Sequence, residues 1–250
     1  MISLKSKREI QIIQAAAEIL KKVFVKVKAA IRPGVTTAEL DAIAEAVILA
    51  EGGESAFKGY RGFPKTACIS LNEQVVHGIP GPVKLKDGDI VSFDIGAKVD
   101  GYYADAARTW PVGQVGPEKI RLIETAREAL EAGLAAYKPG CRIGDLSERI
   151  QNRIESRGFQ VVRDYVGHGI GRAIHEDPQV PNYGRAGHGP KIEPGLVLAI
   201  EPMVTEGHYA VETLKDGWTV VTKDRKLSSH YEDTIAFTEN GFINLTRTED

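Results

Sequence analysis

Hydrophobic residues recur at intervals of three and four along the first fifty positions. Before them, Ser6-Lys7-Arg8-Glu9 has the spacing of a capping box, in which serine and glutamate satisfy free backbone amides. The apolar positions that share one helical face are Ile10, Ile13, Ala17, Leu20, Phe24 and Val27. Arg32-Pro33-Gly34 ends this pattern, and Thr36-Thr37-Ala38-Glu39 opens a second helix that reaches about Ala50. The N-terminal pattern therefore predicts two successive helices.

A second pair of helices separates two groups of short apolar stretches. Pro117 at a first helical position begins a helix to about Tyr137, and Asp145 to Ser156 forms the next. The strands expected are Ile69–Ser70, Glu73–Val76, Ile90–Lys98 and Tyr102–Trp110, then Phe159–His168, Val197–Met203, Trp218–Thr222 and His230–Phe237. Helices and strands thus come in blocks, which predicts an α+β fold with a largely antiparallel sheet.

Two stretches of the chain repeat each other about 107 residues apart, and each ends in a carboxylate. The segment from Leu85 to Asp94 aligns with that from Ile192 to Glu201, with a turn glycine followed by an apolar strand in both. Two copies at so long a period indicate an internal duplication and not a solenoid. We therefore expect one domain over residues 1–250, with half-repeats of about 1–110 and 111–250.

Composition narrows the classes of function. The net charge of −2 provides no basic footprint for nucleic acid. Two cysteines, Cys68 and Cys141, do not make a disulfide framework and suit a reducing compartment. Because the N-terminus has no secretory hydrophobic region and no apolar run has membrane-spanning length, we expect a cytoplasmic protein.

Two acids are predicted to lie on one face of a hairpin. Asp100-Gly101 is a strong two-residue turn signal between strand-like segments. If the turn is there, facing residues sum to 201, so that Asp94 faces Ala107 and Asp105 lies one diagonal step away. Two acids on one face repel unless a cation separates them. The alternative is that one acid caps a turn or faces solvent.

Three further residues are candidates for the same site. His168 lies between glycines in Gly167-His168-Gly169, which leaves room for a ligand, although an isolated histidine is more often a satisfied core residue. Glu201 ends an apolar run, and its alternative is a buried ion pair. Glu232 lies inside the last predicted strand, where the alternative is an edge charge.

These five residues would carry about four negative charges at neutral pH, which two divalent cations would balance. Oxygen-rich sites with one nitrogen suit Mn, Fe, Co or Zn. The set contains no thiolate, so we do not expect a structural zinc site.

Together these motifs resemble those of type I methionine aminopeptidases of the short bacterial form, over essentially the whole chain. The segments that carry the resemblance are Ser92–Gly96, Gly101–Asp105, Gly167–Gly171, His175-Glu176, Ile200–Met203 and Tyr231–Thr234. The resemblance implies a pita-bread fold, a curved antiparallel sheet backed by helices with pseudo-twofold symmetry. It also implies removal of the initiator methionine from nascent proteins and peptides when the second residue is small.

The resemblance also implies a role for each site residue. Two divalent metals would be held by Asp94, Asp105, His168, Glu201 and Glu232, with Asp105 and Glu232 bridging. A metal-bridging water would attack the scissile carbonyl, and Glu201 would pass the proton to the leaving amine. His175 would stabilise the oxyanion, and His77 would also face the substrate amide.

A methionine pocket is implied as well, formed by Tyr60, Phe63, Cys68 and Trp218 with His77 at its edge. Three residues depart from the pattern of some or many members: Phe57, Ile174 and Asp233. None of them is an expected ligand, so these departures concern substrate preference.

Other functions remain open at this point. A proline-specific aminopeptidase or dipeptidase of the same fold is the nearest alternative, and a non-enzymatic peptide-binding module is another. We expect a monomer that acts on N-terminal methionine peptides, without membrane or specific nucleic-acid partners. Docking on ribosomes through Lys215, Lys223, Arg225 and Lys226 is a further hypothesis.

Overall fold

The computed structural model describes residues 2–248. Two helices, α1 (Lys7–Ala30) and α2 (Thr37–Ala50), open the chain, and both predicted capping boxes are present. Ser6 accepts a hydrogen bond from the amide of Glu9, and Thr36 accepts one from the amide of Glu39. The apolar face of α1 packs on the first sheet, with Phe24 edge-on to Phe93 and Trp110.

The first sheet consists of four antiparallel strands built around a long hairpin. These are β1 (Glu54–Ser55), β2 (Ala67–Leu71), β4 (Ile90–Val99) and β5 (Tyr102–Pro111). In the hairpin β4–β5, Asp94 pairs with Ala107 and Gly96 with Asp105, which confirms the predicted register. Both turn residues have positive φ, 47° at Asp100 and 80° at Gly101, as expected for a tight two-residue hairpin turn.

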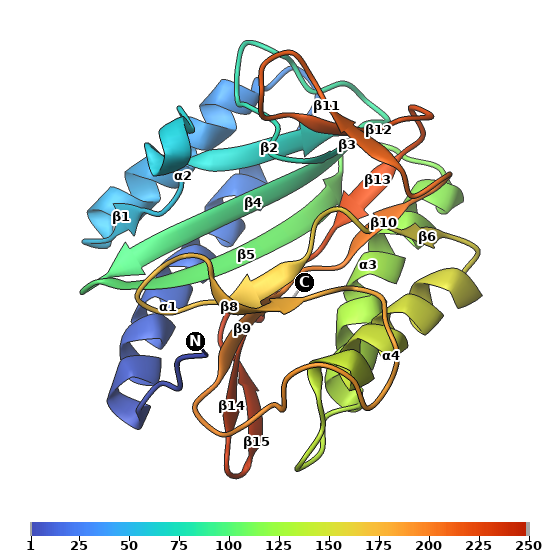
Figure 1. The fold of residues 1–250 in the computed structure, drawn as a ribbon. Helices are drawn as coiled ribbons and strands as arrows, with labels where there is room; N and C mark the ends of the chain where they lie inside the picture. The colour runs from blue at the N-terminus through green and yellow to red at the C-terminus, as the bar shows by residue number, and fades with distance from the viewer. Residues whose placement is uncertain (1, 249–250) are drawn as a thin grey trace.

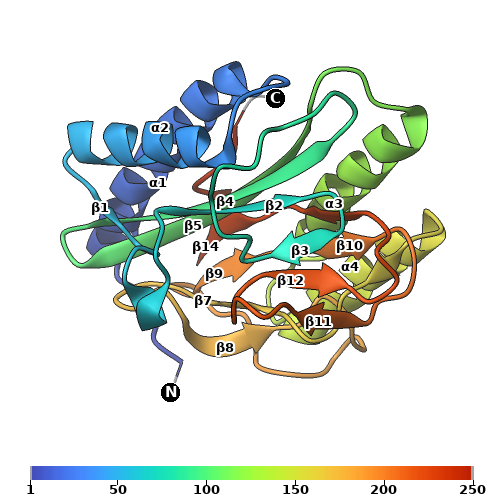
Figure 2. The ribbon, with the colours of Figure 1, turned by 90° about the horizontal axis from the view of Figure 1, so that it is seen from above.

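The second helix pair, α3 (Pro117–Ala135) and α4 (Ile143–Ser156), packs on a separate hydrophobic cluster from that of α1 and α2. Figure 1 shows the two helix pairs at opposite ends of the molecule. In Figure 2, α1 and α2 lie on one side of β4 and β5, and β8 and β11 lie on the other. The predicted α+β fold with antiparallel sheets is confirmed. The bounds of the two half-repeats and of the single domain stay predictions.

Three further sheets are present among the described residues. A five-stranded sheet has the order β15-β14-β9-β7-β8, with β15 (Gly241–Asn244), β14 (Asp233–Thr238), β9 (Val197–Ile200), β7 (Gly167–Gly169) and β8 (Glu176–Val180). A second sheet joins β13 (Ser228–His230), β10 (Met203–Thr205) and β6 (Gln160–Val161). A third joins β11 (Val211–Thr213), β12 (Val220–Thr222) and β3 (Gln74–Val76). A short 3-10 turn, η1, spans Tyr60–Gly62.

The strand predictions of the second half were partly wrong. Phe159–His168 is not one strand, because the chain bends at the exposed Arg163-Asp164 and only β6 and β7 remain. Val197–Met203 breaks at Glu201-Pro202, where proline lacks an amide for the ladder. His230–Phe237 breaks at Tyr231-Glu232. The strands β1, β8, β11 and β15 were missed. Among residues 2–248, the helices are too short or too polar to cross a membrane.

Candidate metal centre

The hairpin β4–β5 presents two acids at the centre of the molecule. Asp94 is 9% exposed and Asp105 is 3% exposed. Each has an Oδ1 atom that is buried and has no hydrogen-bond partner among the described residues. An unpartnered carboxylate oxygen is costly to bury, so both side chains are oriented for a ligand or a cation.

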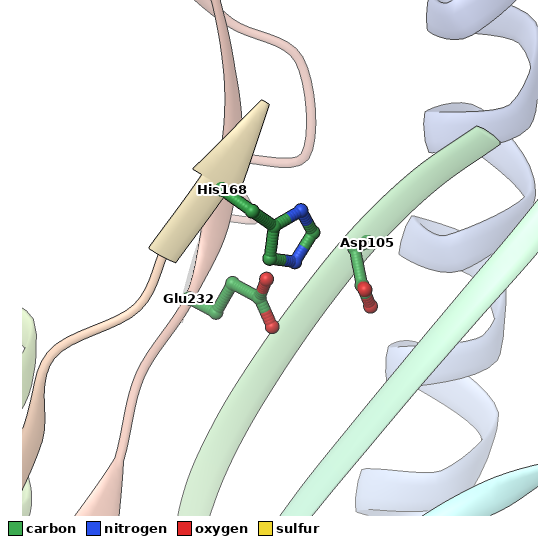
Figure 3. A group of neighbouring side chains, drawn as sticks. All are labelled: Asp105, His168 and Glu232. Atoms are coloured by element: carbon green, nitrogen blue, oxygen red, sulfur yellow. The ribbon is translucent and has the colours of Figure 1, made fainter. Parts of the chain in front are cut away.

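Asp105, His168 and Glu232 converge from separate elements. One ligand atom from each lies within 4.8 Å of the other two. Figure 3 shows the three side chains pointing toward one another, with Asp105 on β5 and His168 on β7. His168 Nδ1 lies 3.0 Å from the carbonyl oxygen of Gly169. If Nδ1 donates to that carbonyl, Nε2 keeps its lone pair for a metal, which is the usual arrangement of a histidine ligand.

The carboxylate of Glu201 lies between the imidazoles of His168 and His230. Its Oε1 is 3.7 Å from His168 Nε2, and its Oε2 is 3.7 Å from His230 Nε2. His230 is 1% exposed, and its Nε2 has no hydrogen-bond partner among the described residues. Sequence reasoning missed His230, although its position two residues before Glu232 was a signal.

Glu201 and Glu232 occupy two of the three breaks in the predicted strands, and polar contacts fix their backbones. The carbonyl of Glu201 accepts a hydrogen bond of 2.9 Å from Asn182 Nδ2. The amide and carbonyl of Glu232 pair with those of Ala107 on β5. Arg108 Nη1 also donates to the Glu232 carbonyl, over 2.6 Å. Each carboxylate therefore projects from a segment that a neighbouring element holds in place.

Behind Glu232, Arg108 forms a buried network that the sequence did not reveal. Its guanidinium donates over 2.7 Å to Asp233 and over 3.0 Å to the carbonyl of Thr246. The rings of Phe24 and Tyr231 pack against it, at 4.9 Å and 4.2 Å from the guanidinium carbon. Asp233, which departs from the family pattern, is therefore an ion-pair partner and does not face the site.

Burial raises the pKa of all four acids of the site: Asp94, Asp105, Glu201 and Glu232. The charge of Asp105 further raises the pKa of the other three. Burial also lowers the pKa of His168 to about 3, so the imidazole is neutral. Without a cation, burial and the mutual repulsion of these carboxylates therefore favour their protonated, neutral forms.

The donor set fits divalent cations. It offers four carboxylates and a neutral imidazole, and two of the oxygens have no partner among the described residues. Carboxylate and imidazole ligands suit Mn, Fe, Co and Zn. The residues present therefore match the predicted metal site, while the number of ions and the role of each ligand stay predictions.

A cavity of about 380 Å³ opens on these acids and is lined by all eleven predicted site residues. The ring centroids of His175 and His168 lie 4.3 Å apart with the ring planes tilted by 51°, and His175 Nδ1 lies 2.9 Å from the Tyr60 hydroxyl. Burial, and to a lesser extent His175, lowers the pKa of His77 to about 4.

Part of the cavity wall, next to the acids, is apolar. Phe63 and Trp218 pack edge to face at 5.1 Å, and Trp218 lies 6.2 Å from the ring of His77. Cys68 is buried beside them and pairs with Asp94 across β2 and β4. The predicted methionine pocket is therefore a contiguous apolar wall directly beside the acids.

Two of the departures also lie here. Phe57 lines the cavity, and Ile174 packs in the same apolar cluster. A side chain at Gly96 would meet Ala56 at 2.7 Å, Phe57 at 3.0 Å and Ile174 at 3.3 Å. Phe57 and Ile174 therefore fill the space that glycine leaves behind the pocket.

Known proteins resemble this chain over almost its whole length. The model of metallopeptidase family M24 matches residues 11–239. A methionine aminopeptidase of Clostridium perfringens is 52% identical over 241 residues, which cover 96% of this chain and 97% of that protein. The solved methionine aminopeptidase of Thermotoga maritima superimposes with a TM-score of 0.97 at 44% identity, over 99% of this chain and 100% of that one.

A prolidase from Pyrococcus furiosus shares the fold at greater distance. Its TM-score is 0.80 at 27% identity, and the match covers 99% of this chain but 66% of the prolidase. These neighbours confirm the predicted pita-bread fold.

Proposed function

This chain belongs to metallopeptidase family M24 and, within it, to the methionine aminopeptidases, and we propose that it removes N-terminal methionine from peptides and nascent proteins whose second residue is small. It is an enzyme of the metal-dependent exopeptidase class. The observation that carries the proposal is one cavity in which a cluster of buried acids lies directly beside an aromatic, sulfur-lined wall.

Two divalent ions would be held by Asp94, Asp105, His168, Glu201 and Glu232. Two such ions balance about four carboxylate charges, which supports two sites in place of one. When bound, they supply Lewis acidity for the scissile carbonyl and lower the pKa of water to near neutrality.

Glu201 would move the proton. Its place between the Nε2 atoms of His168 and His230, inside the buried cluster of acids, suits a carboxylate that accepts a proton from water and passes it to the leaving amine. Glu201 would therefore serve both as a ligand and as the proton shuttle.

His175 and His77 would bind the reacting amide from the open side. Burial lowers the pKa of both imidazoles, so each is neutral and can donate one hydrogen bond. His175 would donate to the oxyanion as the carbonyl becomes tetrahedral, a role that is commonly worth about 100-fold or more in turnover.

The apolar wall would select methionine. A thioether packs favourably against aromatic edges and sulfur, and Tyr60, Phe63, Cys68 and Trp218 offer such surfaces. Since the pocket lies directly beside the acids, a bulky second residue would displace the scissile bond.

A peptide panel on the metal-reconstituted enzyme tests the function. We expect cleavage of Met-Gly, Met-Ala and Met-Ser peptides, and loss of at least about 100-fold in kcat/KM for Met-Leu, because a misplaced scissile bond loses that much. Equal rates on Met-Gly and Met-Leu would contradict the specificity. Faster cleavage of X-Pro peptides would instead favour the prolidase alternative, which the incomplete coverage of the Pyrococcus furiosus prolidase does not support.

Docking on the ribosome stays a prediction. Lys215, Lys223, Arg225 and Lys226 are exposed, which supports it. Arg225 pairs with Glu212, and this pairing reduces the local positive charge.

A further inference from the structure

A buried ion pair connects the N-terminal segment to the loop that carries His175. Lys5 Nζ donates to Glu176 Oε2, and the side chains of the two residues are 3% and 14% exposed. Lys7, two residues later, is exposed. A lysine ammonium is rarely buried unless it is paired, so this contact needs a structural or functional explanation.

Two glycines leave the space through which Lys5 passes. A Cβ at Gly171 would lie 2.2 Å from Lys5 Cε, and a Cβ at Gly195 would lie 2.9 Å from the Lys5 carbonyl oxygen. The amide of Lys5 donates to the carbonyl of Gly195 over 2.6 Å, and its ammonium also donates to the carbonyl of Ser3 over 2.8 Å. The chain before α1 therefore lies against the turn at Gly195, which precedes β9, and against the 171–175 loop, in one defined position.

The other oxygen of Glu176 holds the loop itself. Glu176 Oε1 accepts hydrogen bonds from the amides of Arg172, over 2.7 Å, and Ala173, over 3.1 Å. At the start of the loop, the carbonyl of Gly171 accepts from the amide of Tyr103 on β5. One carboxylate thus joins Lys5 on one side to the backbone of the loop on the other.

His175 is the residue immediately before Glu176. Its ring lies 4.3 Å from that of His168 and stacks on Tyr60 at 5.3 Å. A shift of the loop would therefore move the imidazole relative to the acids, because little of the chain separates it from the Glu176 carboxylate.

We propose that Lys5 is a positioning residue for catalysis, which acts through Glu176 to hold His175 in place over the buried acids. The proposal rests on the role proposed above for His175. Lys5 does not touch the cavity, since it is absent from its lining, so its effect must pass through the loop. A misplacement of about 1 Å in a catalytic group can cost about 100-fold in rate.

The experiment compares Lys5→Met with Lys7→Met in the full-length, metal-reconstituted enzyme on a Met-Ala peptide. Methionine keeps the length of the side chain and removes its charge. We expect Lys5→Met to lower kcat about tenfold, within the range that such a misplacement allows. We expect KM and metal content to change little, and Lys7→Met to match wild type. Equal kcat values for the two variants would overturn the proposal.

A double-mutant cycle separates positioning from general destabilisation. Glu176→Gln keeps an acceptor for the loop amides but removes the ion pair, so it should lower kcat as Lys5→Met does. In a His175→Ala background, Lys5→Met should cause no further loss of kcat, because its target is gone. If Lys5→Met lowers kcat by the same factor in the wild-type and His175→Ala backgrounds, Lys5 does not act through His175. That result would contradict the inference and leave the proposed peptidase function untouched.

A readout without turnover keeps the proposal testable if wild type does not cleave Met-Ala peptides, a result that would contradict the proposed function alone. This readout is the NMR spectrum of protein with isotope-labelled histidines, in which the imidazole resonance of His175 is assigned by its loss in His175→Ala. The chemical shift of that resonance should change in Lys5→Met and in Glu176→Gln. It should stay unchanged in Lys7→Met. An unshifted signal in both ion-pair variants would refute the inference.

Discussion

The two halves of the molecule deliver their acids to the site in different ways. Asp94 and Asp105 lie on an unbroken hairpin of two ten-residue strands, and β2 pairs along the other edge of β4. Glu201 and Glu232 lie in gaps, between β9 and β10 and between β13 and β14. In the hairpin, the pleat of the strands sets the direction of each side chain. In the gaps between strands, Glu201 and Glu232 are held by contacts from neighbouring elements.

Those outside contacts are few and specific. Asn182 holds the backbone of Glu201, while Ala107 and Arg108 hold that of Glu232. Where a strand is broken, the side chain no longer has to follow the alternation between the two faces of the sheet, so the carboxylate can turn into the site. Its position then depends on the few residues that hydrogen-bond to its backbone. We therefore expect the second-half acids to be more sensitive to distant substitutions than the hairpin acids.

The largest effect is expected for Arg108→Met. This change leaves Asp233 buried without its cation and removes one of the two hydrogen bonds to the carbonyl of Glu232, leaving the one from the amide of Ala107. Breaking a buried pair by removing one partner costs about 3–5 kcal/mol. Urea unfolding of the metal-loaded protein measures this. A loss below about 1 kcal/mol would show that the network does not anchor the second half.

Glu201→Gln should lower kcat at least about 100-fold, the usual scale for a general base. The amide keeps the shape of the side chain and removes its basicity, so the fold should be retained. Steady-state kinetics, together with metal analysis by mass spectrometry, checks this. Full activity with metal still bound would show that Glu201 is not the proton shuttle.

Asn182→Ala tests whether the hydrogen bond from Asn182 to the Glu201 carbonyl keeps Glu201 in position. The side chain is fully buried and donates to the Glu201 carbonyl. Loss of one buried hydrogen bond should cost about 1 kcal/mol of stability, and kcat should fall because the glutamate backbone is released. The change in melting temperature and kcat are measured on the same preparation. Unchanged kcat would show that the break in the strand holds Glu201 without help.

The smallest effect is expected for Glu54→Ala on the hairpin side. Glu54 pairs at 3.1 Å with Lys98 on β4, and its side chain is 69% exposed. An exposed ion pair is worth less than about 1 kcal/mol, and β2 and β5 hold β4 without it. Stability should change by less than that amount and kcat should match wild type. A clear loss of activity would contradict the independence of the hairpin acids.

The same difference between the two halves explains which elements could be predicted from the sequence. The capping boxes at Ser6 and Thr36 were predictable because they depend on residues three positions apart. The hairpin register followed from one turn, Asp100-Gly101, and two alternating strands. The strands around Glu201 and Glu232 were predicted as continuous, because local hydrophobicity does not report where a strand must stop.

The four helices, the hairpin that carries Asp94 and Asp105 and, through the resemblance to a family, the set of candidate ligands could all be predicted from the amino-acid sequence. The pairing of Arg108 with Asp233 behind Glu232, the place of His230 beside Glu201 and the contact of Lys5 with Glu176 became visible only in the folded structure. These contacts join residues more than twenty positions apart. Their partners are chosen by how the elements pack, and no short-range pattern in the chain encodes that choice.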